Sequence, residues 1–423
     1  MLLDIFNPGA KTWLWSFYRK YTDQGVAGWW GDLGEPEVHP EDLYHCNGIA
    51  GEVHNLFGHE WAKTIFEGYR RNYPLRRPVI LMRSGFVGTQ RYGIIPWSGD
   101  VNRTWGGLQS QVEIATTMSM MGLPYMHSDL GGFAGNYKDA ELYTRWLQYG
   151  VFQPVFRTHA QEEVPPECIY WDPQTLDIAR RFIRLRYSLL PYIYTLAFKN
   201  SVEGSPLMRP LFYQENDPAL FNRTDSYYWG DHFLVRPIIR PGIGEVSIDL
   251  PSGTWIDFWT EEVFAGGQTV ERPVDIRTIP VFVRAGAFIP MVAPTTNTDN
   301  YTSRKLYLHY YNDASVQTAA DSMYEDDGYL YDAYHKGRYE MAHFRYFKKK
   351  GVRSFLLSKS GNGYKSSSRD VSLIIHHLEY LPVSVWVDHR RIDNYTYDKT
   401  NQKLTIPVKW TDKRVNVEIH LND

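Results

Sequence analysis

The sequence predicts an α/β fold in which the last five βα units of a (β/α)8 barrel are followed by two all-β domains. In the first half, short apolar runs alternate with amphipathic helical segments, a pattern typical of strands buried on both faces of a parallel sheet. Each run ends in polar side chains, as barrel strands do at the face where ligands bind. From about residue 225, short β-type runs separated by Pro-Gly turns take over.

The barrel-like half contains helical and strand-like segments in alternation. The predicted helices cover residues 11–24, 56–72, 107–121, 141–150 and 173–199. The predicted strands cover residues 25–30, 78–83, 124–129, 153–157 and 206–212. A closed barrel needs eight strands, so we expect the missing ones to precede this chain in a longer protein. An open doubly wound sheet would also alternate, but it more often carries an early phosphate-binding glycine loop, which this sequence lacks.

The second half predicts two β-domains. Short β runs at 233–239, 246–250 and 278–284 favour a first antiparallel domain, and a polar stretch at 295–302 is typical of a linker. Further β runs at 372–375 and 385–388 favour a second. The predicted division is therefore a partial barrel at 1–215, a proximal β-domain at 216–294 and a distal β-domain at 295–423.

Composition narrows the function classes. Hydrophobic residues make up 43% of the 423 residues and charged residues 22%, which is typical of a globular protein of two or three domains. A formal net charge of −3 without a long basic run argues against nucleic acid and anionic membranes as partners. No apolar run reaches the roughly 18 residues of a membrane span. Cys46 and Cys168 lie too far apart in sequence to indicate a disulfide framework or a zinc site.

The aromatic content, 15% with 14 Trp and 31 Tyr, is unusually high. Most of these rings are expected in the core. Aromatic faces also stack on the apolar faces of sugars, so the excess modestly favours a carbohydrate-binding protein.

Two carboxylates lie in similar surroundings. Asp32 sits in the turn Trp29–Glu37 after one apolar run, and Asp100 ends the stretch Ile94–Asp100 after another. A pair of carboxylates is what glycosidic bond chemistry requires, one attacking or activating and one protonating the leaving oxygen. The apolar residues before Asp100 predict that it is withdrawn from water. Taken singly, either aspartate is better explained as a turn or helix-cap residue, and that explanation weakens for the pair.

Ordered motifs follow these turns along the chain. They are Trp30–Glu35, Arg83–Phe86, Trp97–Asp100, Ser128–Phe133 and Phe156–His159. Together they resemble glycoside hydrolase family 31, which contains α-glucosidases, α-xylosidases and α-transglucosylases. The resemblance covers most of residues 5–215, and Tyr324–Gly328 is similar to the family's distal β-domain.

The resemblance implies a role for each of several residues. Asp32 is expected to be the nucleophile and Asp100 the general acid/base. The expected substrate-binding residues are Arg83, Trp97, Asp129, Phe133, His159, Trp30 and Arg157. Alternatives remain open: Arg83 and Arg157 can form structural ion pairs, and His159 can be a core histidine.

The resemblance also suggests a branch of the family. Many members carry Met-Asn after the nucleophile, where this chain has Leu33-Gly34; this form, with the stretch Gln90–Trp105, looks most like bacterial oligosaccharide 4-α-glucosyltransferases. The expected reaction is transfer of single glucosyl units between α-1,4-glucans or maltooligosaccharides through a covalent β-glucosyl-aspartate. An exo-acting α-glucosidase is the alternative. A third possibility is an inactive or carbohydrate-binding fragment, since the resemblance places a β-sandwich and the first barrel strands before this chain.

Four histidines could suggest a metal site near Glu35 and Glu37: His39, His45, His54 and His59. Their spacing matches no ligand pattern and the expected chemistry needs no metal, so neither metal nor other cofactor is expected. The first residues lack the features of a signal peptide. For the complete protein we expect a bacterial periplasmic or extracellular location; the sequence leaves the oligomeric state open.

Overall fold

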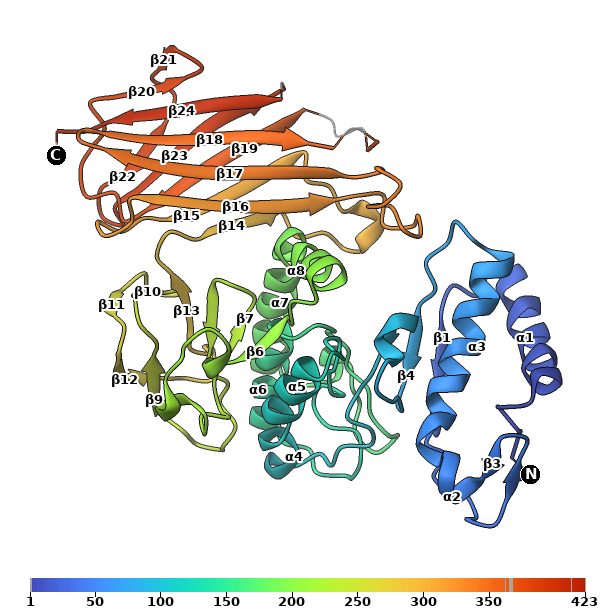
Figure 1. Cartoon of the computed structure of the whole chain (residues 1–423). Coiled ribbons are helices and arrows are strands. Elements are labelled where there is room, and N and C mark those ends of the chain that lie inside the picture. The colour runs from blue at the N-terminus through green and yellow to red at the C-terminus, as the bar shows by residue number, and fades with distance from the viewer. Residues whose placement is uncertain (1, 362, 365–367, 412, 423) are drawn as a thin grey trace. The chain divides into compact units, whose positions relative to one another are not determined.

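The computed structural model describes residues 2–361, 363–364, 368–411 and 413–422. They form two compact units (Figure 1). The first unit comprises Met1–Lys138, Gln153–Glu167 and Gly328–Asp332. The second unit comprises Asp139–Phe152, Cys168–Asp327 and Ala333–Asp423. Within the described ranges, no helix combines the length and apolar character that crossing a membrane requires.

A small parallel sheet forms the centre of the first unit. It contains β1 (Trp29–Gly31), β4 (Ile80–Met82) and β5 (Ile94–Ile95) in the order β1-β4-β5, and both pairings are parallel. The other elements of this unit are α1 (Pro8–Asp23), β2 (Tyr44–His45), β3 (Gly48–Ile49), α2 (Ala50–Val53), α3 (Phe57–Asn72), α4 (Trp105–Gln109) and α5 (Gln111–Met120). The predicted alternation of parallel strands and helices is present, and the predicted helix at 107–121 is divided into two.

The next two predicted strands are reduced to single bridges. Trp97 pairs in parallel with His127, and Leu130 pairs in parallel with Thr158. The expected strands at 124–129 and 153–157 are therefore wrong as continuous strands. Each segment contains a proline near its start, Pro124 or Pro154, and proline has no N–H to donate to a ladder. The bridges nevertheless continue the parallel order beyond β5.

The core of the first unit lies between the sheet and two helices. Asn7 caps α1, its side-chain oxygen accepting from the backbone N–H groups of Gly9 and Ala10. Trp15 of α1 packs with Ile65 of α3, and both belong to a cluster that includes residues of all three strands. The two helices approach closely at Gly68, because a Cβ there would lie 2.2 Å from the Trp15 ring.

The helices of the second unit are α6 (Ala140–Val151), α7 (Pro173–Ser188) and α8 (Leu190–Glu203). The single helix predicted at 173–199 is wrong: it is broken at Leu189. Pro191 explains the break, because proline lacks the N–H that would continue the ladder and its ring clashes with the preceding turn.

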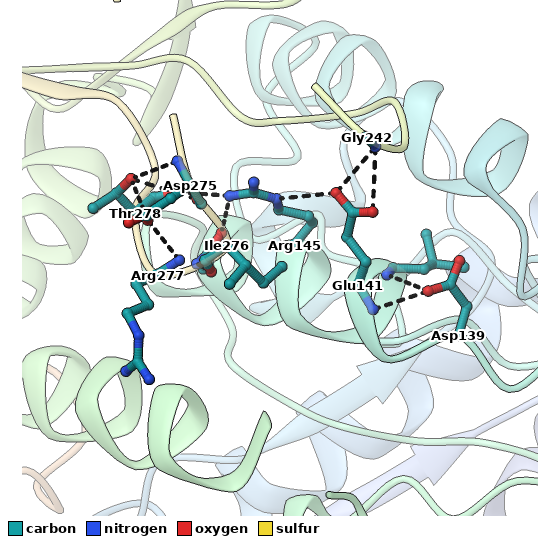
Figure 2. A network of polar contacts seen from close by, with 10 residues as sticks. Asp139, Glu141, Arg145, Gly242, Asp275, Ile276, Arg277 and Thr278 are labelled. Atoms are coloured by element: carbon teal, nitrogen blue, oxygen red, sulfur yellow. Dashed lines mark hydrogen bonds and ion pairs between the residues drawn. The ribbon is translucent and has the colours of Figure 1, made fainter. Parts of the chain in front are cut away.

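Helix α6 is tied to two loops of the same unit (Figure 2). Arg145 donates to the carbonyl of Thr278 at 2.7 Å, and the carboxylate of Glu141 accepts from the backbone N–H of Gly242 at 3.2 Å. Arg145 is almost fully buried, so these contacts satisfy donors that water cannot reach. The network fixes α6 to the β-rich part of the unit.

Two antiparallel sheets follow α8. The larger has the order β11-β10-β13-β8-β7-β6, with β6 (Met208–Pro210), β7 (Tyr227–Trp229), β8 (Phe233–Val235), β10 (Thr254–Asp257), β11 (Val263–Ala265) and β13 (Val281–Arg284). The smaller pairs β9 (Glu245–Leu250) with β12 (Gln268–Pro273). The segment predicted to end the parallel series at 206–212 instead pairs antiparallel with β7, so that expectation is wrong. Whether a strand pairs in parallel or antiparallel depends on its partner strand, and an apolar run does not specify that partner.

The last part of the chain is a pair of sheets around one core. The five-stranded sheet has the order β14 (Phe288–Val292), β15 (Lys305–Tyr311), β19 (Arg369–His376), β23 (Lys403–Trp410) and β22 (Thr396–Asp398). The six-stranded sheet has the order β16 (Thr318–Glu325), β17 (Glu340–Lys349), β18 (Val352–Ser360), β24 (Arg414–His420), β20 (Ser384–Val387) and β21 (Arg390–Ile392). Strands β14 and β15 pair across the stretch expected to be a linker. The predicted three-domain division stays a prediction.

Candidate active site

One arginine side chain contacts four carboxylates in the first unit. The guanidinium of Arg83 donates to both oxygens of Glu35, at 2.8 and 3.1 Å, and to Glu37 at 2.5 Å. Its Nη1 lies 3.3 Å from Asp32 Oδ1 and 3.5 Å from Asp100 Oδ1. The hydrogen bonds that Arg83 donates to Glu35 and Glu37 raise the pKa of Arg83 further above its usual value, against the opposing effect of burial. Arg83 is therefore a permanent cation that gathers the two candidate catalytic aspartates.

Strand register explains why these side chains meet. Gly31 of β1 pairs with Met82 of β4, so the next residues, Asp32 and Arg83, leave adjacent strands at the same end. The N–H of Arg83 donates to the carbonyl of Gly31 at 3.1 Å and continues the pairing by one step. Asp100 follows β5, the third strand. The site thus lies at the carboxyl ends of parallel strands, where βα folds place their ligands.

The turn after Asp32 holds an unusual backbone conformation. Leu33 has φ of 54°, in the left-handed region that side-chain-bearing residues rarely adopt, and it is half exposed. Its N–H donates to Asp32 Oδ1 at 2.9 Å. A Cβ on Gly34 would lie 2.8 Å from Ser84 Oγ, so the turn also requires close approach to the segment after β4. These constraints aim Asp32 toward Arg83 and away from its own strand.

The two aspartates are close enough for a pair of catalytic carboxylates. Arg83 Nη1 lies 3.3 Å from Asp32 Oδ1 and 3.5 Å from Asp100 Oδ1. The separation of these two oxygens therefore cannot exceed the sum of the two distances. This bound allows the separation of ~5 to 5.5 Å found in retaining glycosidases and reaches only the low end of the ~6.5–9.5 Å range of inverting ones.

Both carboxylates face solvent. The side chains of Asp32 and Asp100 are 47% and 52% exposed. The expectation that the apolar run before Asp100 withdraws it from water is therefore wrong. Trp97 of that run is buried, but Gly99, with φ of 75°, turns the chain so that Asp100 projects outward.

A second ion pair lies deeper in the unit. Arg157 Nη2 donates to Asp129 Oδ1, and Arg157 Nε donates to His127 Nε2 at 3.2 Å. Asp129 has no exposed surface, and no described residue hydrogen-bonds its Oδ2. Burial raises the pKa of Asp129 to about 7, and Asp100 and Asp32 add to that effect while Arg157 opposes it. Burial, together with Arg157, lowers the pKa of His127 to about 3, so its neutral ring accepts from the arginine.

Aromatic rings surround Arg157. Its guanidinium lies 5.1 Å from the ring centre of Trp30 and 5.8 Å from that of Trp97. His159 contacts Trp30 edge-on at 4.9 Å and stacks on Phe133 at 5.2 Å. Burial and Arg157 lower the pKa of His159, although Asp100 and Asp32 act in the opposite direction. Trp30, Trp97, His159 and Phe133 are thus linked by ring contacts around Arg157; their role in sugar binding stays a prediction.

The structure brings all nine sequence-predicted site residues into one unit. Arg83 contacts Asp32 and Asp100. Arg157 contacts Asp129, Trp30 and Trp97, and it is linked to His159 and Phe133 through a chain of ring contacts that begins at Trp30. The ion pair of Arg157 with Asp129 is present, as the structural alternative for Arg157 required, and it leaves Asp129 Oδ2 buried without a partner among the described residues.

Sequence reasoning did not predict three of the contacts. Glu35 and Glu37 were not predicted to bind Arg83. Their two-residue spacing is the signal that could have indicated that both side chains lie on the same side of the turn. His127 was not predicted to bind Arg157. Its place two residues before Asp129, on the same face of an extended segment, is the signal that could have identified it.

The histidines considered as metal ligands are arranged as a chain. His39 Nε2 lies 2.7 Å from His45 Nε2, and His39 Nδ1 lies 2.9 Å from His54 Nδ1. His45 Nδ1 lies 3.1 Å from Asp4 Oδ1, whereas His59 contacts Thr89 elsewhere in the unit. His39 uses its two nitrogens on opposite sides of its ring, so the three imidazoles do not converge on one point. Among the described residues, no group of three or more such side chains is arranged to hold a metal ion.

A (β/α) arrangement with paired carboxylates at its strand ends is one that many glycosidases share. Residues 1–196 match the TIM-barrel domain of the glycosyl hydrolases family 31, and residues 204–289 match the C-terminal domain of that family. The chain belongs to glycoside hydrolase family 31.

Individual relatives agree with this assignment. The chain is 35% identical over 353 residues to an α-xylosidase of Saccharolobus solfataricus, covering 79% of this chain and 47% of the relative. It is 31% identical to α-glucosidase 2 of Bacillus thermoamyloliquefaciens, covering 88% and 48%. The chain thus spans about half the length of these curated relatives.

Solved structures with the same fold include a family 31 dextranase of Flavobacterium johnsoniae in complex with isomaltotriose. It superposes with a TM-score of 0.94 at 26% identity, covering 99% of this chain and 56% of that one. A cycloalternan-forming enzyme of Listeria monocytogenes in complex with a pentasaccharide superposes with a TM-score of 0.84 at 26% identity, covering 99% and 40%. The similarity to 4-α-glucosyltransferases expected from the sequence is not among these findings.

Proposed function

We propose that this chain carries the catalytic carboxylates of a retaining enzyme that acts on α-glucans. The observation that supports this most directly is the position of Arg83 Nη1 between Asp32 and Asp100. One cation contacts both carboxylates at the same strand ends, and the upper bound on their oxygen–oxygen distance allows the separation that a double displacement uses. In this proposal Arg83 orients Asp32 and Asp100 and also donates to a sugar hydroxyl.

The proposed reaction has two steps. In the first, a carboxylate oxygen of Asp32 forms a bond to the anomeric carbon while the glycosidic bond breaks, and the departing oxygen takes the electron pair and the proton of Asp100. In the second, Asp100 as a carboxylate removes the proton of an acceptor hydroxyl, which bonds to the anomeric carbon and releases Asp32. Two inversions give net retention.

The second ion pair supplies the proposed sugar-binding contacts. Asp129 Oδ2 has no partner among the described residues, so a sugar hydroxyl can donate to it. Trp30 lies near the Arg157 guanidinium and also contacts His159. In this proposal both rings contact the sugar. A buried acceptor without a partner costs roughly 1–3 kcal/mol, and binding substrate relieves that cost.

The acceptor in the second step distinguishes transfer from hydrolysis. We propose transfer of single glucosyl units between α-1,4-glucans, because Leu33-Gly34 follow the nucleophile as in the 4-α-glucosyltransferases that the sequence resembles. Hydrolysis by an exo-acting α-glucosidase is the second candidate, which α-glucosidases among the relatives favour. Product analysis on maltotriose separates them: longer oligosaccharides with maltose support transfer, and mostly free glucose supports hydrolysis.

The test of the shared mechanism is replacement of the nucleophile in this protein. Asp32→Ala should abolish turnover of maltotriose, and added azide should restore turnover of an aryl α-glucoside with formation of the β-glucosyl azide. Asp42→Ala is the matched control, because Asp42 is an exposed aspartate of the same loop. Near-normal turnover in Asp32→Ala would contradict the proposal.

A further inference from the structure

A cavity of about 440 Å³ lies in the second unit, apart from the residues of the candidate active site. It opens on the five-stranded sheet, on the face opposite the sandwich core, where β14, β15, β19 and β23 contribute side chains. The turn between β10 and β11 covers one side of it with Phe258 and Glu261. This volume is within the range of roughly 300–1,000 Å³ typical of small-ligand pockets.

Strand β15 lines the cavity with every second residue. Tyr307, His309 and Tyr311 share its outer face, while Leu308 and Tyr310 point into the core. The Tyr307 side chain is 37% exposed and lies opposite Met291 of β14. The cavity therefore has an accessible aromatic ring at its mouth and a buried one, Tyr311, farther along the same strand.

Two polar atoms are available on this face. No described residue hydrogen-bonds the phenolic oxygen of Tyr311, although that residue is only 3% exposed. His309 shares a hydrogen bond of 2.9 Å with His376 through Nδ1, and its Nε2 has no partner among the described residues. Burial lowers the pKa of His309 to about 3, so its ring is neutral. A donor and an acceptor are thus held inside an otherwise apolar and aromatic cavity.

The neighbouring charges cancel. Lys403 Nζ donates to Glu261 Oε1, and His376 Nδ1 lies 3.2 Å from the same oxygen. Burial would raise the pKa of Glu261, but contacts with His376 and Lys403 outweigh it and lower the pKa to about 2. Glu261 also has φ of 62°, a conformation that side-chain-bearing residues rarely adopt. The paired charges orient the histidines and leave no net charge to attract an ion.

We propose that this cavity is a second carbohydrate site, which binds one pyranose unit of a neutral sugar chain through residues other than those of the candidate catalytic centre. The ring of Tyr307 stacks on the apolar face of the sugar, Tyr311 donates to one hydroxyl, and His309 Nε2 accepts from another. The neutral lining disfavours an anionic or cationic ligand. The site does not depend on the catalytic roles of Asp32 and Asp100.

Titration calorimetry of the chain with maltoheptaose and, separately, with glucose tests this site. We expect Tyr311→Phe, which removes one oxygen, and Tyr307→Ala, which removes the exposed ring, each to weaken binding of at least one ligand by roughly fivefold. Weaker binding of maltoheptaose alone assigns the site to a glucan chain, and equal weakening for glucose assigns it to a single sugar.

Tyr380→Ala is the matched control, because Tyr380 is an exposed tyrosine of the same unit that does not line the cavity. Circular dichroism checks that each variant is folded. Unchanged affinity for both ligands in both folded variants would overturn the proposal. Turnover of a small aryl α-glucoside, measured in parallel, reports on the catalytic proposal alone, so the two proposals can fail separately.

Discussion

Arg157 and Asp129 form an ion pair in which the carboxylate has no exposed surface, and the second oxygen of Asp129 has no partner among the described residues. Nη1 of Arg157 is likewise buried without a described partner. Such a pair is costly to desolvate, and its remaining polar atoms are available to a ligand. The pair therefore connects the stability of the first unit to the binding of substrate.

The pKa of Asp129 predicts a pH dependence of stability. Its pKa of about 7 in the folded chain lies above the ordinary value of 3.8, so the folded state binds this proton more tightly than the unfolded state. The contribution to folding is complete below about pH 4 and is lost as the pH rises to about 7. A shift of this size corresponds to about 4 kcal/mol. Urea unfolding between pH 4 and pH 8 measures it.

Asp129→Asn provides the comparison, because the amide has the same shape and does not titrate in this range. As the pH rises from 4 to 7, the free energy of unfolding of the wild type should decrease relative to that of Asp129→Asn. A difference that is constant over this range would show that Asp129 is ionised throughout in the folded chain.

Arg83→Lys should reduce kcat/KM of the protein by roughly 100-fold. A lysine keeps the charge but cannot donate to both oxygens of Glu35 while it contacts Asp32 and Asp100. The carboxylates of Asp32 and Asp100 are then no longer positioned by the same side chain. Initial rates on an aryl α-glucoside measure the effect. Arg91→Lys, at an exposed arginine that contacts none of these carboxylates, is the control. Equal loss in both variants would contradict a positioning role.

Gly68→Ala should lower the free energy of unfolding by about 1–3 kcal/mol, because the added methyl group overlaps the Trp15 ring at 2.2 Å. Gly51→Ala, in α2, is the control: the nearest atom to its added Cβ lies 3.9 Å away, so alanine there should be neutral or slightly stabilising. Thermal unfolding of both variants measures the difference. Similar melting temperatures would mean that α1 and α3 separate easily at this point.

The sequence was informative about the turns that carry the chemistry. Asp32 and Asp100 were identified because each follows an apolar run and lies beside tryptophan, and both of these runs contain strand residues in the structure, β1 and β5. The helices at the start of the chain were predicted equally well from their apolar periodicity. These are local properties, and the structure reproduces them closely.

Other features required the partner segment to be known. The antiparallel direction of β6 depends on β7, and the parallel bridges at His127 and Thr158 depend on their partners Trp97 and Leu130. The convergence of Glu35, Glu37 and Asp100 on Arg83 depends on the register of β1 with β4. None of these relationships is a property of one segment, so periodicity could not reveal them.

By itself, the sequence determined which residues could do chemistry and on which strand ends they would lie. Side-chain type and apolar periodicity are local properties that can be read directly from the sequence. Only the tertiary structure decided that Asp32 and Asp100 share one arginine, that Asp100 faces solvent, and that Tyr311 and His309 open into a separate cavity. Those outcomes arise from strand register, backbone turns and burial, which depend on contacts between segments far apart in the chain.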